Sequence, residues 1–481
     1  MSLSTSSPVQ FEVEWRVPVG CGFSGFFTEV ALGFVPGLHD KGVAVRLLTG
    51  KCDDVWLDGQ LEARDAATYR ATWADENARS AQQTHGALVI EHGEPCSMRR
   101  WQSSSARPWR VVARTMTESS LKAEQAACLR HADEIWVPTA WHVDTFVAAG
   151  IARSLLHVVP EPVDVDFFHP NYIPSVVEEP SDGPLGWWKR PSAKVGDTPA
   201  PSPSPFVFLS SFKWEWRKGW DLLLEAYWCE FTSARERSAV KLVIKSYLPS
   251  WEPGPRDLNE WVSRHALQVA RAPRDKLAPV ELLQEDVSRV ALRRLYARSN
   301  CFVLPTRGEG WGLPIAEAMA MGLPVIATNF SGPTAFLTAH NSHQLPVARE
   351  LAGGFAETTV AMLRQAMRRA YDEATSGDGA AAKERGARAR ATMVEHFSRG
   401  AVADVVLRRL KVLGATLAPS RSLYGELPPP PPRRSSAVSS AVPPADELRR
   451  KRRLHGHAWG SSHTRKGLRR YEALYVYPVV A

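Results

Sequence analysis

The chain has 481 residues, 44% of them hydrophobic and 23% charged, a composition typical of a soluble globular protein with about two to four domains. Its formal charge of +8 arises at one end, because residues 411–481 carry 13 basic and 4 acidic side chains and the preceding part is close to neutral. This distribution excludes a protein whose whole body binds nucleic acid. No run approaches the roughly 18 apolar residues that a membrane span needs.

The cysteines give no sign of a disulfide framework or a metal site. They are widely spaced and form no C-x-x-C pair, and a chain of this length does not need disulfides to hold a core. We therefore expect six reduced thiols. The first ten residues carry no positive charge and lead into no apolar stretch, which argues against a secretory signal. Together these features predict a cytoplasmic protein. The six cysteines are Cys21, Cys52, Cys96, Cys128, Cys229 and Cys301.

Two low-complexity segments divide the chain. Residues 171–205 contain eight prolines with Gly and Ser between them, which predicts an interdomain linker or insertion. Residues 418–481 include five consecutive prolines and the sequence RRKRR, which predicts a mostly disordered basic tail with weak affinity for anionic surfaces. The expected domains are 11–170 and 206–390, followed by C-terminal helices at 391–417.

Strand-like and helix-like segments alternate in both expected domains. The first domain has apolar runs at 14–19, 43–48, 87–91, 109–115, 134–139 and 155–161. The second has apolar runs at 206–212, 240–248, 301–306 and 324–329, with helical spacing at 219–231 and 288–299. This alternation predicts parallel sheets covered by helices on both faces. The expected fold class is α/β, with two Rossmann-like doubly wound domains facing each other across a cleft.

A glycine-rich segment near the N-terminus matches the dinucleotide-binding fingerprint. The sequence GCGFSG at 20–25 follows a strand, so an NAD-dependent oxidoreductase is one alternative. That function needs an acidic residue at the end of the second strand to hold the ribose, and Asp53 comes too late for this role. Gly33 and Pro36 are also expected to interrupt the following helix. We favour a turn that lets a ligand or a facing domain approach the backbone.

The pair Asp164 and Asp166 looks like a metal-binding D-x-D motif. The pair directly precedes the proline-rich segment at 171–205. A role in a turn and hinge is therefore the favoured interpretation, and no metal or other cofactor is expected.

Residues 301–329 carry the most informative pattern. A strand ends near Thr306, a glycine-rich loop follows, and Pro314 suits the first turn of a helix. A helix that begins at the carboxyl end of a parallel strand directs its free N–H groups into the crevice where α/β sheets bind ligands. Glu309 lies in the loop and Glu317 in the expected first helical turn. A diphosphate bound there would leave one carboxylate for sugar hydroxyls and the other for ribose hydroxyls.

This segment resembles the E-x7-E motif of retaining glycosyltransferases with the two-domain GT-B fold, in particular family 4 (glycosyl transferases group 1). The resemblance implies that Glu309 contacts the transferred sugar and Glu317 the ribose of the nucleotide. It further implies that the diphosphate lies near the backbone of Gly310, Gly312 and Leu313.

Residues 210–227 resemble the first strand–loop–helix unit of the second domain in this family. Two basic residues of that unit neutralise the donor diphosphate. Lys218 matches the second of them, while Lys213 and Arg217 are alternatives for the first.

Two stretches of the first domain also resemble the family. Residues 22–30 resemble the turn that faces the donor, which implies contacts from Gly22, Ser24 and Gly25. The sequence EHGEP resembles a short histidine-containing segment at a strand end, which makes His92 a candidate for contact with the acceptor or the sugar.

The resemblance as a whole implies transfer of a hexose from a UDP- or GDP-sugar to an acceptor hydroxyl, without a bound metal. Neither the acceptor nor the oligomeric state can be inferred. The alternatives are the NAD-dependent oxidoreductase, a sugar phosphorylase or nucleotide-sugar epimerase of the same fold, and a non-catalytic nucleotide-sugar-binding protein.

Overall fold

The computed structural model describes residues 10–11, 13–17, 25–74, 88–98, 109–171, 204–285, 287–413 and 416–417. All of them belong to one compact unit, Met1–Glu426. The expected linker at 171–205 lies outside the described residues except at its two ends, and the expected tail at 418–481 lies outside them entirely. Within the described ranges, no helix is long and apolar enough to cross a membrane.

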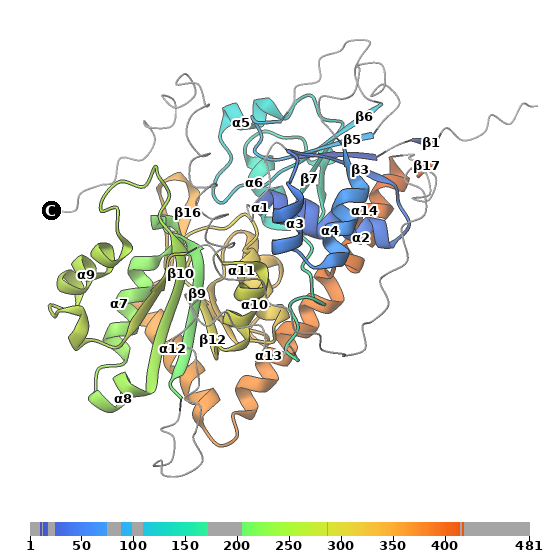
Figure 1. Cartoon of the computed structure of the whole chain (residues 1–481). Helices are drawn as coiled ribbons and strands as arrows, with labels where there is room; N and C mark the ends of the chain where they lie inside the picture. Colours follow the sequence, from blue (N-terminus) through green and yellow to red (C-terminus); the bar gives the residue numbers. More distant parts are fainter. Residues whose placement is uncertain are drawn as a thin grey trace, which may run out of the picture. The chain divides into compact units, whose positions relative to one another are not determined.

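The first domain is built on a seven-stranded sheet in the order β4-β3-β2-β5-β6-β7-β8 (Figure 1). All pairings are parallel. Each expected apolar run contains one strand, because strands covered on both faces are apolar throughout. The short β4 was not expected. The strands are β2 (Val13–Arg16), β3 (Val45–Leu48), β4 (Trp73–Ala74), β5 (Leu88–His92), β6 (Arg110–Arg114), β7 (Glu134–Val137) and β8 (Leu156–Val158).

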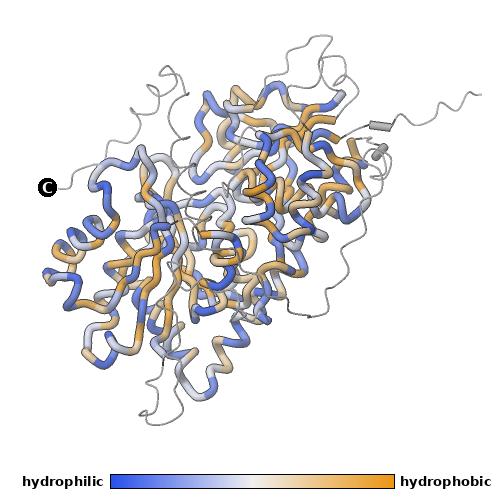
Figure 2. Tube along the Cα trace, viewed as in Figure 1, coloured by the Kyte–Doolittle hydropathy of each residue, from blue (hydrophilic) through white to orange (hydrophobic). Residues whose placement is uncertain are grey.

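The second domain is built on a six-stranded parallel sheet in the order β11-β10-β9-β12-β13-β14. Figure 2 shows hydrophobic residues concentrated along the strands of both sheets. Two strands were not expected, β11 and β14, because they are short and carry polar residues. The strands are β9 (Phe206–Lys213), β10 (Val240–Tyr247), β11 (Val280–Leu283), β12 (Cys301–Leu304), β13 (Val325–Thr328) and β14 (His343–Leu345).

Helices cover both faces of the second sheet. Helices α7 (Trp220–Glu230) and α12 (Val360–Thr375) pack together on one face, and α10 (Arg289–Ala297) and α11 (Leu313–Ala320) lie on the other (Figure 1). The two expected Rossmann-like sheets are thereby confirmed. Further described helices are α3 (Asp54–Gln60), α4 (Ala63–Thr72), α5 (Ala123–Cys128), α6 (Ala140–Ala148), α8 (Ala234–Ala239), α9 (Leu258–Val269) and α13 (Ala380–Thr392). Short strands also pair β1 (Gln10–Phe11) with β17 (Thr416–Leu417), and β15 (Arg349–Leu351) with β16 (Phe355–Glu357).

The helix after β2 continues through the residues that were expected to interrupt it. Helix α1 (Gly25–Glu29) passes through one wider turn into α2 (Val35–Asp40). Pro36 is the second residue of α2 and follows the wider turn directly. Gly33 is required by packing, because a Cβ there would lie 2.6 Å from Cγ of Pro162. The expectation of an interrupted helix was wrong for this reason.

The last helix, α14 (Arg399–Val412), returns to the first domain and packs on α2. Its apolar side chains complete the core around the first sheet. Helix α14 therefore carries the described part of the chain back to the first domain. The contributing residues are Val402, Ala403, Val406 and Leu410.

The expectation of six reduced thiols was wrong. Cys96 and Cys128 form a disulfide with a Cα–Cα distance of 5.2 Å, and Cys52 is also disulfide-bonded. Cys229 and Cys301 are free. The wide spacing of the cysteines gave no sign of this disulfide. Residues 32 positions apart meet only once the segment after β5 and helix α5 have packed together.

Candidate active site

Lys218 and Glu309 form a nearly buried ion pair beside the second sheet. Lys218 ends the one-turn helix Trp216–Lys218, which follows β9, and Glu309 lies in the loop after β12. Lys218 Nζ donates to both carboxylate oxygens of Glu309, at 2.7 and 2.8 Å. The two side chains are only 12% and 7% exposed. The structure thus brings together the residues that the resemblance assigns to the diphosphate and to the transferred sugar.

Arg217 lies beside this pair, whereas Lys213 pairs elsewhere. Arg217 Nη1 is 3.6 Å from Oε2 of Glu309. Lys213 Nζ is 3.3 Å from Oε1 of Glu215. The geometry favours Arg217 over Lys213 as the companion of Lys218.

The charges of this cluster are coupled. Burial raises the pKa of the Glu309 carboxyl, but Lys218 and Arg217 outweigh it and the net shift is downward. Burial and the Arg217 charge lower the pKa of the Lys218 ammonium, against the raising effect of Glu309. A diphosphate carries more negative charge than one carboxylate and accepts charge-assisted hydrogen bonds from the same donors. It would therefore compete with Glu309 for both cations.

Arg307 anchors the turn that carries these cations. Its Nη1 atom donates to Trp216 O at 2.7 Å, and its backbone N–H donates to Arg217 O at 2.7 Å. The guanidinium forms two hydrogen bonds with Asp221, at 2.8 and 2.7 Å, and one with Glu357 at 2.8 Å. Its side chain is 3% exposed. The turn is therefore held to the Glu309 loop from both backbone and side chain.

Gly219 allows the turn and the strand end to meet. Its φ is +69°, and a Cβ at this position would lie 2.1 Å from Pro305 O. Any other residue would separate the two segments.

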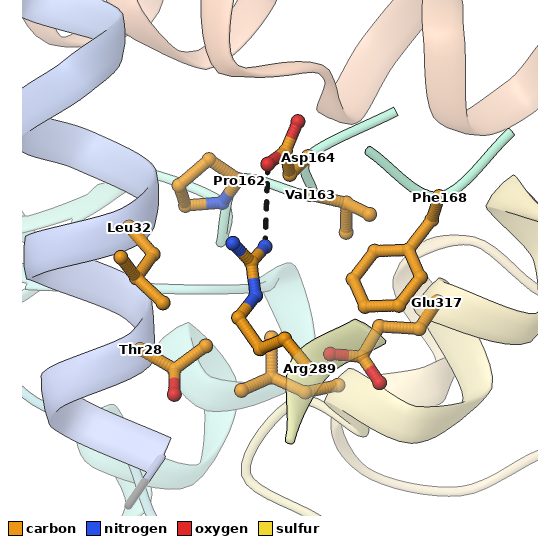
Figure 3. Close-up of a pocket in the computed structure, with 9 residues that line it drawn as sticks. Thr28, Leu32, Pro162, Val163, Asp164, Phe168, Arg289 and Glu317 are labelled. Carbon is orange, nitrogen blue, oxygen red and sulfur yellow. Dashed lines mark hydrogen bonds and ion pairs between the residues drawn. The ribbon is translucent and has the colours of Figure 1, made fainter. Parts of the chain in front are cut away.

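Glu317 lines a cavity between the two domains, and Figure 3 shows its carboxylate with the side chains of Arg289 and Asp164. It is the fifth residue of α11, not part of the first turn as expected, because the helix begins at Leu313. The cavity measures about 20 Å³, enough for a water molecule, so a ribose enters only if the lining residues move apart. The lining residues are Thr28, Leu32, Pro162, Val163, Asp164, Phe168, Arg289, Leu313 and Glu317.

The surroundings of Glu317 shift the pKa of its carboxyl to near neutral pH. Burial raises its pKa to about 7, although a hydrogen bond from Tyr296 opposes the shift. The Tyr296 hydroxyl donates to Oε2 of Glu317 at 2.9 Å. Burial and this carboxylate raise the pKa of Tyr296 well above its usual value, so the tyrosine keeps its proton and remains a donor.

The first domain packs directly on the Glu309 loop. A Cβ on Gly308 would lie 2.2 Å from Glu118 O, and one on Gly310 would lie 2.3 Å from Sδ of Met116. Arg217 Nη2 also pairs with the Glu118 carboxylate at 3.2 Å. The glycines of the loop therefore permit close contact between the domains at the site.

His92 belongs to a buried network of the first domain. Trp15 Nε1 donates to its Nδ1 at 3.3 Å, so the ring proton lies on Nε2, which donates to Glu29 at 3.0 Å. The ring is fully buried, and burial lowers its pKa to about 3. Both ring nitrogens are engaged inside the domain, and contact with an acceptor or sugar stays a prediction.

The same network contains three groups spaced as metal ligands could be. Donor atoms of Glu29, His92 and Glu161 lie within 4.8 Å of one another. The Nε2 proton of His92 occupies the lone pair that a metal would need, and Arg114 pairs with Glu161, which disfavours a further cation there. These residues do not fit a metal ion.

Asp53 and Asp164 have structural partners, as do two aromatic side chains near the site. Asp53 caps α3 by accepting from Trp56 N at 2.8 Å, and Asp164 accepts from Phe167 N in a turn at 3.1 Å. The Trp141 ring packs on Phe330 at 5.4 Å, and His142 is buried and bonds to Thr117 O at 2.9 Å.

Only some of the predicted donor-contacting residues in the glycine-rich segments are described by the structure. Gly25 begins α1, and Gly312 precedes α11 with φ +102°. Gly22 and Ser24 lie outside the described residues, so their contact with the donor stays a prediction.

Sequence reasoning missed Arg307, Tyr296 and Glu118. Arg307 meets Asp221 across 86 positions, and Tyr296 meets Glu317 across 21. The only sequence signal is the adjacency of Arg307 to the Glu309 loop, which does not reveal its partners.

Comparison with known proteins gives a family match for the second domain. Residues 204–365 match the family model described as glycosyl transferases group 1. A segment of 86 residues is 38% identical to a sucrose synthase of Melioribacter roseus and covers 18% of this chain and 10% of that protein. The match therefore spans about a tenth of that relative's own length.

Solved structures of low sequence identity share the fold. Anabaena HepE in complex with UDP and glucose superposes with a TM-score of 0.59 at 14% identity, covering 84% of this chain and all of that one. Sucrose-phosphate synthase from Thermosynechococcus elongatus gives a TM-score of 0.55 at 13% identity, covering 84% and 99%. Both alignments extend over most of the chain and hence include both sheets. Residues 204–365 therefore match the glycosyl transferases group 1 family, and the chain has the two-domain GT-B fold.

Proposed function

We propose that this protein transfers a hexosyl unit from a UDP- or GDP-sugar to an acceptor hydroxyl, with retention of the anomeric configuration. The buried Lys218–Glu309 pair with Arg217 beside it carries the proposal. The match of residues 204–365 to the glycosyl transferases group 1 model and the similarity to HepE, which was solved in complex with UDP and glucose, support a nucleotide-sugar donor.

In this proposal the basic residues act on the leaving group. As the bond between the anomeric carbon and the diphosphate oxygen breaks and the acceptor oxygen bonds to that carbon, negative charge grows on the diphosphate, which takes up the proton of the acceptor hydroxyl. Lys218 and Arg217, which their turn holds close together, would stabilise this charge, and stabilisation of this kind is usually the largest single contribution to catalysis. Glu309 is released from Lys218 to accept hydrogen bonds from the sugar, and Glu317 accepts from the ribose. No resident metal is proposed.

The alternatives have less support from the described residues. The oxidoreductase needs a carboxylate for the ribose after the second strand, but Asp53 caps a helix there. A phosphorylase, an epimerase and a non-catalytic binding protein share the fold, and only product analysis separates them from the proposed transferase.

The donor can be identified by thermal shift with UDP-, GDP- and ADP-sugars, followed by measurement of nucleotide release. Lys218→Ala should lower kcat about 10²–10³-fold, because it removes one pre-oriented donor to the leaving group. Lys276→Ala, an exposed lysine, is the control. The proposal fails if no sugar nucleotide raises Tm or releases nucleotide, or if Lys218→Ala turns over like Lys276→Ala.

A further inference from the structure

Ser331 has a backbone conformation that glycine normally supplies. It follows β13 and has φ +53° and ψ −131°. Within the described ranges, Arg271 is the other non-glycine residue with positive φ. Side chains are disfavoured in this region because Cβ approaches the neighbouring backbone, and such strain is typically stored at functional sites. Ser331 is also fully buried, so its position is not that of a surface turn.

The strained residue holds Glu309. The Glu309 N–H donates to Oγ of Ser331 at 2.8 Å. The next residue, Gly332, donates its N–H to Glu309 O at 2.9 Å. The turn after β13 therefore binds the peptide groups on both sides of the Glu309 side chain.

The surrounding contacts fix the turn in this conformation. Thr334 donates to Ser331 O from its N–H at 3.2 Å and from its Oγ1 at 2.6 Å. A Cβ on Gly332 would lie 2.5 Å from Gly310 O, so the turn and the Glu309 loop are packed backbone against backbone. These contacts hold the backbone of Ser331 in its strained conformation.

A glycine at 331 would meet every backbone requirement without strain, but it has no hydroxyl. The property that serine adds is an acceptor for the Glu309 N–H. We propose that Ser331 is a positioning residue for the transfer step: its hydroxyl holds Glu309 in place for the sugar, at the cost of an unfavourable backbone conformation. This proposal rests on the proposed function of the site.

Two substitutions separate the hydroxyl from the strain. Ser331→Ala removes the hydroxyl and keeps the strain, whereas Ser331→Gly removes both. Each should lower kcat about 10–100-fold through misplacement of Glu309. The KM for the sugar nucleotide should change less than about 3-fold, because the groups proposed to bind the diphosphate and the ribose are untouched. Ser331→Gly should melt a few degrees above Ser331→Ala.

Ser246→Ala is the matched control, because this buried serine also forms one 2.8 Å side-chain hydrogen bond to the backbone of the same domain. It should keep the parental kcat. The inference is overturned if Ser331→Ala and Ser331→Gly retain parental kcat, or if the glycine variant is not the more stable of the two.

Hydrogen exchange separates this inference from the proposed function. The peptide containing Glu309 should exchange at least 10-fold faster in Ser331→Ala than in the parent or in Ser246→Ala. If the parent releases no nucleotide from any donor, the proposed function fails. Unchanged exchange in Ser331→Ala overturns the anchoring of Glu309 whether or not the parent is active.

Discussion

At the scale of single residues, the two glutamates of the site differ because their partners differ. Glu309 contacts Lys218 directly and has a lowered pKa. Glu317 accepts only from the neutral Tyr296 hydroxyl among its hydrogen-bond partners in the described part of the chain, and burial raises its pKa to about 7. A charged partner offsets the desolvation of a buried carboxylate, and a neutral donor does so only in part. Glu309 is therefore the ionised member of the pair, and Glu317 titrates near neutrality.

This difference predicts a pH dependence of nucleotide binding. Below pH about 7 Glu317 is mainly protonated, and above it the carboxylate can accept from ribose hydroxyls. Affinity for the nucleotide should therefore rise as the pH increases through about 7 and level off above. Isothermal titration should show this rise in the parent, and Glu317→Gln should flatten the part of it that does not come from the phosphate. Identical pH profiles in the two proteins would contradict the assignment.

At the scale of secondary-structure elements, the site depends on how one turn is fastened to one loop. The turn Trp216–Lys218 makes a single helical turn, too short to hold its own position. Arg307 supplies the missing restraint by binding the turn, Asp221 of α7 and Glu357 of β16. The positions of both cations thus depend on one buried guanidinium.

Arg307→Ala should therefore weaken nucleotide binding through Lys218. We expect a loss of about 3 kcal/mol in unfolding free energy, because Asp221 and Glu357 lose their buried partner, and about 10-fold weaker UDP binding. In a Lys218→Ala background the same change should weaken UDP binding by a smaller factor than in the parent, since of the two cations only Arg217 is left for Arg307 to position. Urea denaturation and titration calorimetry measure the two effects.

Arg385→Ala is the control for this double-mutant cycle. Arg385 also forms two hydrogen bonds with one carboxylate, that of Glu373 at 3.1 and 2.9 Å, and it has no described contact with the turn. Its removal should lower stability and leave UDP affinity unchanged. The positioning role of Arg307 would be refuted if Arg307→Ala and Arg385→Ala lost equal UDP affinity. It would also be refuted if the effects of Arg307→Ala and Lys218→Ala on UDP affinity were additive.

At the scale of the whole molecule, a buried charge network joins the two domains. Arg289 of α10 pairs with Asp65 of α4 at 3.1 Å and with Asp164 at 3.2 Å. Arg399 of α14 pairs with the same two carboxylates, at 3.0 and 2.8 Å. Asp164 therefore lies where the chain crosses between the domains. Its contacts agree with the turn and hinge role that was favoured for the Asp164 and Asp166 pair. The two carboxylates and two guanidinium groups alternate in charge. They link α4 of the first domain, the crossing segment, α10 of the second domain and α14.

Removing one member of this network should destabilise the protein strongly. Asp65→Ala leaves two buried guanidinium groups with one carboxylate, and we expect a loss of about 3 kcal/mol. The matched change Asp58→Ala breaks an exposed pair with Arg70 and should cost under about 1 kcal/mol. Urea denaturation measures both. Equal effects would show that the network does not contribute to stability.

Much of the fold and part of the site could be predicted from local patterns. The apolar runs identified most strands, because strands buried on both faces are hydrophobic regardless of their neighbours. The spacing of Glu309 and Glu317 and the glycines between them were sufficient to predict a ligand site after β12. The resemblance of residues 210–227 to the family's first strand–loop–helix unit implied a role for Lys218, which the structure brings to Glu309.

Other features depend on partners that are distant in the chain. Arg307, Tyr296 and Ser331 look ordinary in the sequence, and the Cys96–Cys128 disulfide and the return of α14 to the first domain have no local signal. The amino-acid sequence by itself determined the α/β class, the two sheets and the loop that carries the acidic pair, since these follow from periodicity and short-range spacing. Only the tertiary structure decided which side chains fasten that loop, because hydrogen bonds and ion pairs form between groups that the folding of both domains brings within a few ångströms.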